Sequence, residues 1–208
     1  MKTTKKALLA LVCAVALVFG SVFATYAYLT STTETVTNTF TVGKVEITLD
    51  EEDVDGSKTT VTTEGRDIAN EYQMIPGKTY VKDPTVTVSD DSDDCWLFVT
   101  FKESNNNLDN GKIIVYENNW DGWTKLKEEN GTVIYYREVL KADADRSWVL
   151  LTENEDEEGN PYNIEINEAL SNETMPESGK TPSLEFKAYA IQKDGFNTAE
   201  LAWAELNK

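Results

Sequence analysis

The sequence predicts an all-β fold, an antiparallel sandwich with one short helix at the C-terminus. Short segments of alternating or continuous apolar character recur along the chain, and turns rich in Gly, Asn and Asp separate them. This pattern is typical of sandwiches and barrels, and only the end of the chain shows helical periodicity. The expected strands are residues 35–42, 45–49, 79–88, 96–102, 112–117, 132–140, 148–152, 163–167 and 183–192.

The first two expected strands are out of phase with each other. Alternation in residues 35–42 places Val36 and Phe40 on one face, and after Gly43 the alternation resumes one residue later in 45–49. A slip of one residue moves every side chain to the opposite face of a strand. We therefore expect Gly43 to form a bend or bulge.

Two further strands can be placed from their composition. Pro84 cannot donate to a ladder, so the strand in 79–88 is expected to begin late or to lie at an edge. Residues 96–102 are almost continuously apolar and predict a central strand. Cys95 precedes this run and is interpreted as a small buried hydrophobic residue, not a reactive thiol.

The C-terminal segment has the features of a helix. Asn197 followed by Glu200 resembles a capping box, and Ala199, Trp203 and Leu206 share one face at helical spacing. This helix is expected to close the core.

Composition excludes several functions. The chain has 208 residues, a formal net charge of −18 and no histidine. Without histidine there is no Ser-His-Asp or Cys-His nucleophile and no zinc site built on imidazole. Because phosphate binding needs a basic surface, the charge disfavours nucleic acid as a partner. The sequence therefore predicts a single domain that is not an enzyme.

The N-terminus has the pattern of a secretory signal peptide. Three lysines lie within the first six residues, and an uncharged, largely apolar run extends to residue 27. Cleavage fits a site after Ala27, which leaves Tyr28 as the new N-terminus, or a site after Ala24. The alternative is an uncleaved transmembrane anchor, since the run is long enough to span about 30 Å of hydrocarbon. Membrane contact is expected only through this segment.

Cleavage would also change the cysteine content. It would remove Cys13 and leave Cys95 as the lone cysteine, so no intramolecular disulfide is expected in the exported chain.

Metal and ligand candidates are few. Asn154, Asp156, Glu158 and Glu165 have the spacing of calcium ligands in an EF-hand loop. Pro161, the asparagine at the first position and the strand-like flanks depart from that pattern. The alternative is a set of solvated loops. The sequence therefore predicts no cofactor, with calcium at these loop residues as the alternative.

Trp120 and Trp123 lie in one expected loop. Two functions are compatible with large rings there: packing against the core, or an exposed binding surface.

Several stretches carry a family resemblance. A signal peptide that ends beside an aromatic residue is followed by Asn38-x-Phe40-x-x-Gly43-x-x-x-Ile47, and residues 75–88, 96–101 and 188–203 add further similarity. These stretches resemble the TasA/camelysin-type exported proteins of Gram-positive bacteria. Residues from about 103 to 179 carry no matching motif.

The resemblance implies a fold, a processing route and a function. It implies a jelly-roll sandwich, cleavage after Ala27 by the family's dedicated signal peptidase I of the endoplasmic-reticulum type, and secretion to the cell surface or biofilm matrix. Members of the family form fibres by donor-strand complementation, in which the N-terminal segment of one copy becomes a strand of the next. The corresponding donor strand here is residues 28–37, including Tyr28, Leu29, Thr30 and Val36.

Two alternative functions remain from the sequence. One is a camelysin-type secreted metallo-endopeptidase, against which the absence of histidine argues. The other is a monomeric surface module that binds glycan or protein through Trp120 and Trp123.

Overall fold

A computed structural model describes residues 43–54, 65–171, 173–176 and 180–208. They lie within one compact unit that extends to the C-terminus. The signal peptide, the cleavage site at Ala27 and Tyr28, and the donor strand with Leu29, Thr30 and Val36 lie outside the described residues, and they stay predictions.

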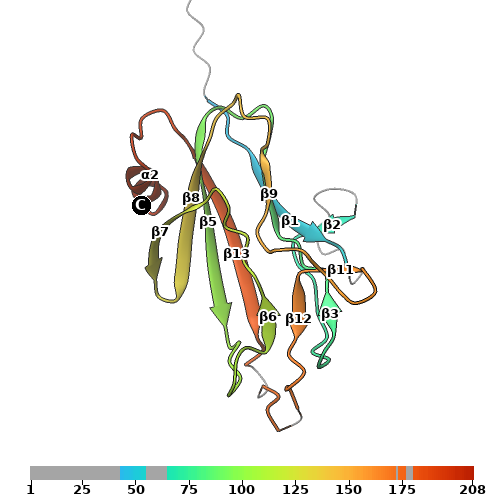
Figure 1. Cartoon of the computed structure of the whole chain (residues 1–208). Helices are drawn as coiled ribbons and strands as arrows, with labels where there is room; N and C mark the ends of the chain where they lie inside the picture. Colours follow the sequence, from blue (N-terminus) through green and yellow to red (C-terminus); the bar gives the residue numbers. More distant parts are fainter. Residues whose placement is uncertain (1–42, 55–64, 172, 177–179) are drawn as a thin grey trace, which may run out of the picture. The chain divides into compact units, whose positions relative to one another are not determined.

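The described part of the chain is an antiparallel β-sandwich with one short helix, which confirms the predicted fold class (Figure 1). The long sheet has the order β13 (Ser183–Gln192), β5 (Cys95–Ser104), β8 (Thr132–Val139), β7 (Thr124–Glu129). The facing sheet has the order β2 (Arg66–Asp67), β1 (Ile47–Glu52), β4 (Thr85–Val88), β9 (Ser147–Val149).

Smaller elements complete the described fold. A small sheet has the order β3 (Thr79–Tyr80), β12 (Ile164–Ile166), β6 (Ile114–Tyr116). The strands β10 (Asn154–Glu155) and β11 (Pro161–Tyr162) form a hairpin, and the helix is α2 (Ala199–Leu206).

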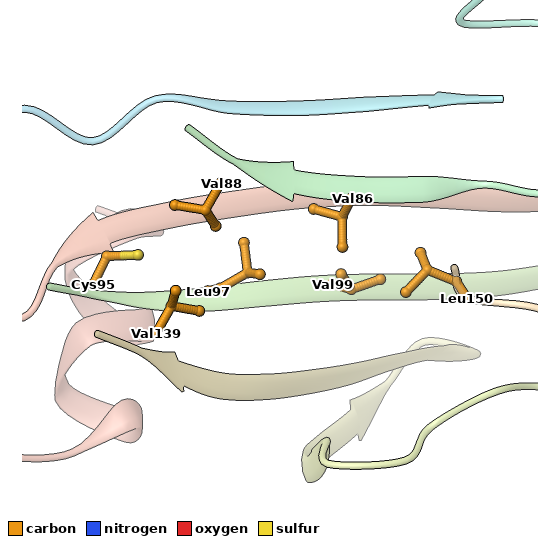
Figure 2. Packing of buried hydrophobic residues seen from close by; sticks show 7 residues of the cluster. All are labelled: Val86, Val88, Cys95, Leu97, Val99, Val139 and Leu150. Carbon is orange, nitrogen blue, oxygen red and sulfur yellow. The ribbon is translucent and has the colours of Figure 1, made fainter. Parts of the chain in front are cut away.

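The core between the two larger sheets is aliphatic. Figure 2 shows Val86 and Val88 of β4 above Leu97 and Val99 of β5. All four side chains are fully buried. Cys95 belongs to the same cluster, and burial raises the pKa of its thiol to about 11. The predicted role of Cys95 as a small buried residue is confirmed.

Part of the outer face of the long sheet is buried by α2. Trp96 and Phe98 of β5 pack with Ala199 and Ala202 of the helix. Because alternate residues of β5 point to opposite faces, both faces of this strand are covered. The predicted central position of the strand is confirmed.

The predicted helix cap is wrong by one residue. The N-cap is Thr198, not Asn197, because Thr198 has extended backbone angles and its hydroxyl accepts a hydrogen bond from the backbone N–H of Leu201. Threonine satisfies the first turn in the same way as asparagine. The predicted packing face is confirmed, since Trp203 and Leu206 lie against the core with the helix alanines.

Other strand predictions can be compared directly. The strand around Pro84 begins late, at Thr85, as predicted. Gly43 lies so close to the side chain of Gln192 that a Cβ atom would be 2.4 Å from its Oε1, so a larger residue here would have to displace the end of that side chain. The strand β7 was not predicted, because it is short and charged. The turn that joins it to β8, Asn130-Gly131, has positive φ at both residues, which is a hairpin signal in the sequence.

We predict that Leu97→Ala strongly destabilises the sandwich. The side chain is fully buried between the two sheets, so its removal leaves a cavity that costs about 2–5 kcal/mol. Urea unfolding monitored by tryptophan fluorescence measures this loss. Leu201→Ala is the matched control, because that leucine is 57% exposed. Equal unfolding midpoints for the two variants would contradict the assigned core.

Candidate functional site: a groove along the edge of β13

The two outer strands of the long sheet are very different. The strand β7 is short, mostly exposed and charged, and its pairing with β8 is irregular between Lys125 and Lys127. Its ion pairs, Lys125–Glu128 and Lys127–Glu129, lie at the surface. Charges and irregular pairing are the usual means by which an edge strand resists addition of a further strand.

The strand β13 has none of this irregularity. It pairs with β5 in one unbroken register over ten residues. Among the strands that the structure describes, β13 pairs with no other, so its second edge forms no ladder, although β1 approaches it. A long, regular edge of this kind is a template for another strand.

A groove of about 670 Å³ lies beside that edge. Residues 183–189 of β13 form one wall, and the end of β1 with the segment after β2 forms the other. Leu49, Phe186 and Ala188 contribute apolar surface from both sheets. We call this cavity, together with the adjoining one described next, the β13 groove.

A second cavity of about 420 Å³ adjoins the first. The two share Asn70, Lys82, Ser183 and Leu184 as lining residues. The second cavity continues toward the small sheet, where its apolar lining residues are Met74, Ile114, Ile164 and Ile166. The β13 groove therefore has two apolar stretches with polar residues between them.

The opposite wall of the groove is also an open edge in part. The strand β1 pairs with β4 from Ile47 to Asp50, and with β2 only at Glu51 and Glu52. Within the described sheets, the second edge of β1 from Ile47 to Asp50 is therefore uncovered. The sandwich is open along the side where β1 and β13 approach.

One ion pair lies inside the groove. Lys82 Nζ is 2.6 Å from Glu51 Oε2, and the two side chains are 13% and 8% exposed. Leu49 packs into the core, so strand alternation turns Glu51 to the same inner face. The ammonium group of Lys82 also lies 5.3 Å from the centroid of the Tyr72 ring.

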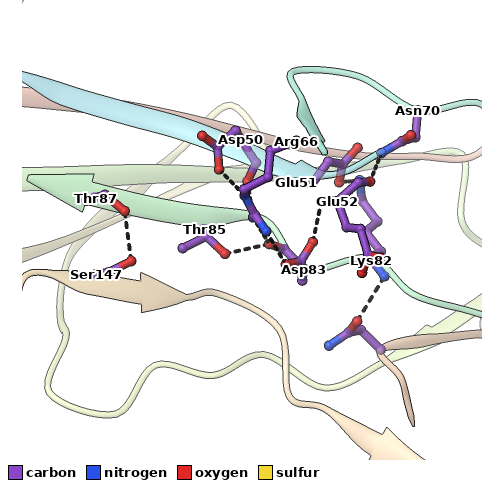
Figure 3. Close-up of polar contacts among 11 residues, drawn as sticks. Asp50, Glu51, Glu52, Arg66, Asn70, Lys82, Asp83, Thr85, Thr87 and Ser147 are labelled. Atoms are coloured by element: carbon purple, nitrogen blue, oxygen red, sulfur yellow. Dashed lines mark hydrogen bonds and ion pairs between the residues drawn. The ribbon is translucent and has the colours of Figure 1, made fainter. Parts of the chain in front are cut away.

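A second set of charges fixes the wall from the outer face (Figure 3). Arg66 Nε donates to Asp50 Oδ1 at 2.5 Å, and Nη1 donates to Asp83 Oδ2 at 2.8 Å. Burial alone would lower the pKa of Arg66, but the hydrogen bonds to both aspartates outweigh it and raise the pKa. Asn70 donates to the carbonyl of Glu52 at 2.7 Å. These contacts hold β2 and the segment after it against the end of β1.

The structure does not bring the predicted calcium ligands together. Asp156 Oδ1 accepts hydrogen bonds from the backbone N–H groups of Glu158 and Asn160, which forms the turn of the β10–β11 hairpin. Asn154 lies in β10, whereas Glu165 lies in β12, the middle strand of the small sheet. Over residues 43–54, 65–171, 173–176 and 180–208, no group of three or more carboxylate or cysteine side chains could hold a metal ion.

The paired tryptophans are packing residues. Trp120 and Trp123 are half-buried against the core of the sandwich. Trp120 stacks on Tyr135 with ring centroids 4.0 Å apart. Trp123 makes an edge-to-face contact with Trp148, and the guanidinium of Arg137 lies 3.9 Å from the centroid of the Trp148 ring. These contacts support the packing interpretation of the loop.

Comparisons with protein-family models, curated proteins and solved structures found no match to this chain. No helix of the described residues is long and apolar enough to cross a membrane.

Sequence reasoning identified β13 as a strand but missed the groove. The order of strands in a sheet is not visible in a single sequence, so the edge position of β13 had no signal. The inward position of Glu51 does have a signal in the sequence, because the alternation of Val45, Ile47 and Leu49 places residue 51 on the same face.

We predict that Arg66→Met loosens the groove wall. Asp50 and Asp83 both lose their guanidinium partner, and partial exposure limits the cost to about 1–2 kcal/mol. Thermal unfolding measures the effect, and hydrogen exchange is expected to increase in β1 and β2. Lys44→Met removes an exposed ion pair and serves as control. An equal effect of the two substitutions would contradict the structural role of Arg66.

Proposed function

We propose that this protein is an exported structural protein of the extracellular matrix, which polymerises when the N-terminal segment of one copy adds as a strand to β13 of the next. The observation that carries the proposal is the ten-residue edge of β13 that no described strand covers, bordered by an apolar groove. The cell surface or biofilm matrix of a Gram-positive bacterium is the expected location.

The chemistry of the groove suits strand addition. An added strand gains main-chain hydrogen bonds from the uncovered edge, and alternate side chains enter pockets beside it. Here the pockets lie between Leu49 of β1 and Phe186 and Ala188 of β13, so every second residue of the occupant can be apolar. The charged and irregular edge of β7 offers neither feature.

The proposed donor strand is residues 28–37, which contain Tyr28, Leu29, Thr30 and Val36. The segment is rich in threonine, contains no proline or glycine, and carries one charge, at Glu34. Such a composition favours extended structure. Cleavage between Ala27 and Tyr28 would free this segment.

The geometry of such a contact determines the assembly. The donor segment and the β13 groove are different surfaces of the same chain, so the contact is head-to-tail. A head-to-tail contact that does not close into a ring produces a filament.

The fibre proposal is preferred over the two alternatives from the sequence. A metallo-endopeptidase would have to work without histidine, because the chain has none. A binding module that uses Trp120 and Trp123 would need rings that are free, whereas both are packed against the core. The uncovered edge of β13 supports polymerisation and neither of these functions.

Truncation tests the proposal. We predict that the chain beginning at Tyr28 forms filaments, visible by electron microscopy, and that a chain lacking residues 28–37 stays monomeric. A chain in which these ten residues are replaced by Gly and Ser controls for length, and it is also expected to stay monomeric. Equal filament formation by all three chains would refute the proposal.

Mixing the chains gives a sharper readout. The truncated chain keeps the groove but lacks the donor, so it can accept a neighbour without extending the filament further. A small fraction added to the chain beginning at Tyr28 is therefore expected to shorten the filaments. Filaments of unchanged length would show that the groove is not the acceptor.

A further inference from the structure

The ion pair inside the β13 groove restricts which strand can occupy it. Glu51 and Lys82 lie between two apolar stretches, one with Leu49 and Phe186 and the other with Ile164 and neighbouring residues. This inference depends on the proposed function, because it concerns the occupant of the same groove.

An apolar side chain opposite this pair would be unfavourable. The two side chains keep about a tenth of their surface exposed, and an apolar neighbour would remove that remaining water without replacing its hydrogen bonds. A side-chain amide is well suited to the position. Its NH₂ group can donate to the carboxylate of Glu51, and its carbonyl oxygen can accept from the ammonium of Lys82.

The occupant therefore needs a particular pattern on its inward face: an apolar residue, then a polar residue, then an apolar residue, each two positions apart. From Tyr28 to Gly43 this pattern occurs once, at Val36, Asn38 and Phe40. The polar residue at its centre is an amide.

We propose that Asn38 of one copy docks against the Glu51–Lys82 pair of the next copy and thereby fixes the register of the added strand. Val36 and Phe40 then enter the apolar stretches on either side. This register extends the donor strand beyond residue 37 to Phe40.

The length of the chain permits docking on a neighbour. With Val36, Asn38 and Phe40 in the groove, Thr41 and Val42 join the docked strand to Gly43 of its own copy. The three steps from Phe40 to Gly43 span up to about 10 Å when extended, so the two copies must lie directly beside each other. Gly43 itself lies beside Gln192, at the C-terminal end of β13 and beyond the groove wall of residues 183–189.

Other registers are disfavoured by the same pair. A shift of two residues would place Val36 or Phe40 opposite the two charges, and a shift of one residue would turn the threonines inward. A single buried polar position specifies register in this way in other assemblies.

A double-mutant cycle tests the contact in the chain that begins at Tyr28. Asn38→Leu is expected to slow filament growth about tenfold, the effect of one lost charge-assisted contact. The groove variant Glu51→Leu/Lys82→Met is expected to slow growth similarly, because it leaves the amide of Asn38 against an apolar wall. The combined variant is expected to recover to within about threefold of the wild type, because an apolar side chain then meets an apolar groove.

Asn119→Leu is the matched control for the added leucine. Asn119 is exposed and is not a lining residue of the groove, so wild-type growth is expected. Near-ultraviolet circular dichroism of the monomers verifies that each variant is folded. If both single-site changes slow growth and the combined variant is as slow as the product of the two effects, the Asn38 contact is refuted.

A cross-link provides a second measurement that does not depend on the groove variants. Benzoylphenylalanine in place of Phe40 is expected to cross-link to the apolar lining of the groove in a neighbouring copy. Isotope-labelled and unlabelled chains, mixed before assembly, distinguish a neighbouring copy from the same chain. A cross-link within one chain, or to β7, would overturn the inference.

Failure of the proposed function and failure of the proposed register give different results. If a chain lacking residues 28–40, and with them Val36, Asn38 and Phe40, forms filaments as well as the full segment does, the proposed function fails. If truncation abolishes filaments but Asn38→Leu leaves the growth rate unchanged, the strand addition stands and the register is refuted.

Discussion

The described structure depends on the burial of both faces of β5. Leu97 and Val99 on the inner face pack against the facing sheet, while Trp96 and Phe98 on the outer face pack against α2. Such a strand must lie inside its sheet, with a partner on each side, and it has β13 on one side and β8 on the other. The strands β13 and β8 and the helix α2 are positioned by direct contact with this strand.

The position of β5 leaves an unequal pair of edges in the long sheet. On one side, β8 is followed by the charged strand β7, which closes that edge to other strands. On the other side, β13 pairs with no described strand besides β5. Its residues Phe186 and Ala188 continue the apolar core to the margin of the sandwich. The core therefore extends to a place where an additional strand would complete it. This asymmetry is the reason that the proposed strand addition is assigned to β13 and not to β7.

The sequence predicted the elements better than their arrangement. Apolar periodicity located β4, β5, β13 and the helix, because each has a buried face that the chain itself encodes. It missed β7, whose exposed face gives no apolar signal, although Asn130-Gly131 marks its turn. The groove could not be predicted, since it arises from the order of strands that are distant in sequence, β1 and β13.

The predicted calcium ligands and Glu51 show which side-chain positions a sequence can predict. Asp156 and Glu158 follow a calcium-like spacing, but spacing in sequence does not decide where a side chain points. The carboxylate of Asp156 satisfies backbone N–H groups in a tight turn, which is a common role of aspartate in hairpins. By contrast, the inward position of Glu51 follows from the alternation before it, because strand geometry is local.

In the proposed assembly, the ion pair of the groove would lower the affinity for an added strand and raise the selectivity among strands. A wholly apolar groove beside an uncovered edge would accept many strands, including the residues of β5 from an incompletely folded copy. Glu51 and Lys82 disfavour such continuously apolar strands, since one inward residue must meet two charges. A weakly apolar segment rich in threonine, with an amide at the matching position, avoids that penalty. In the proposed assembly, the same pair would favour the threonine-rich donor segment over strongly apolar segments of the chain.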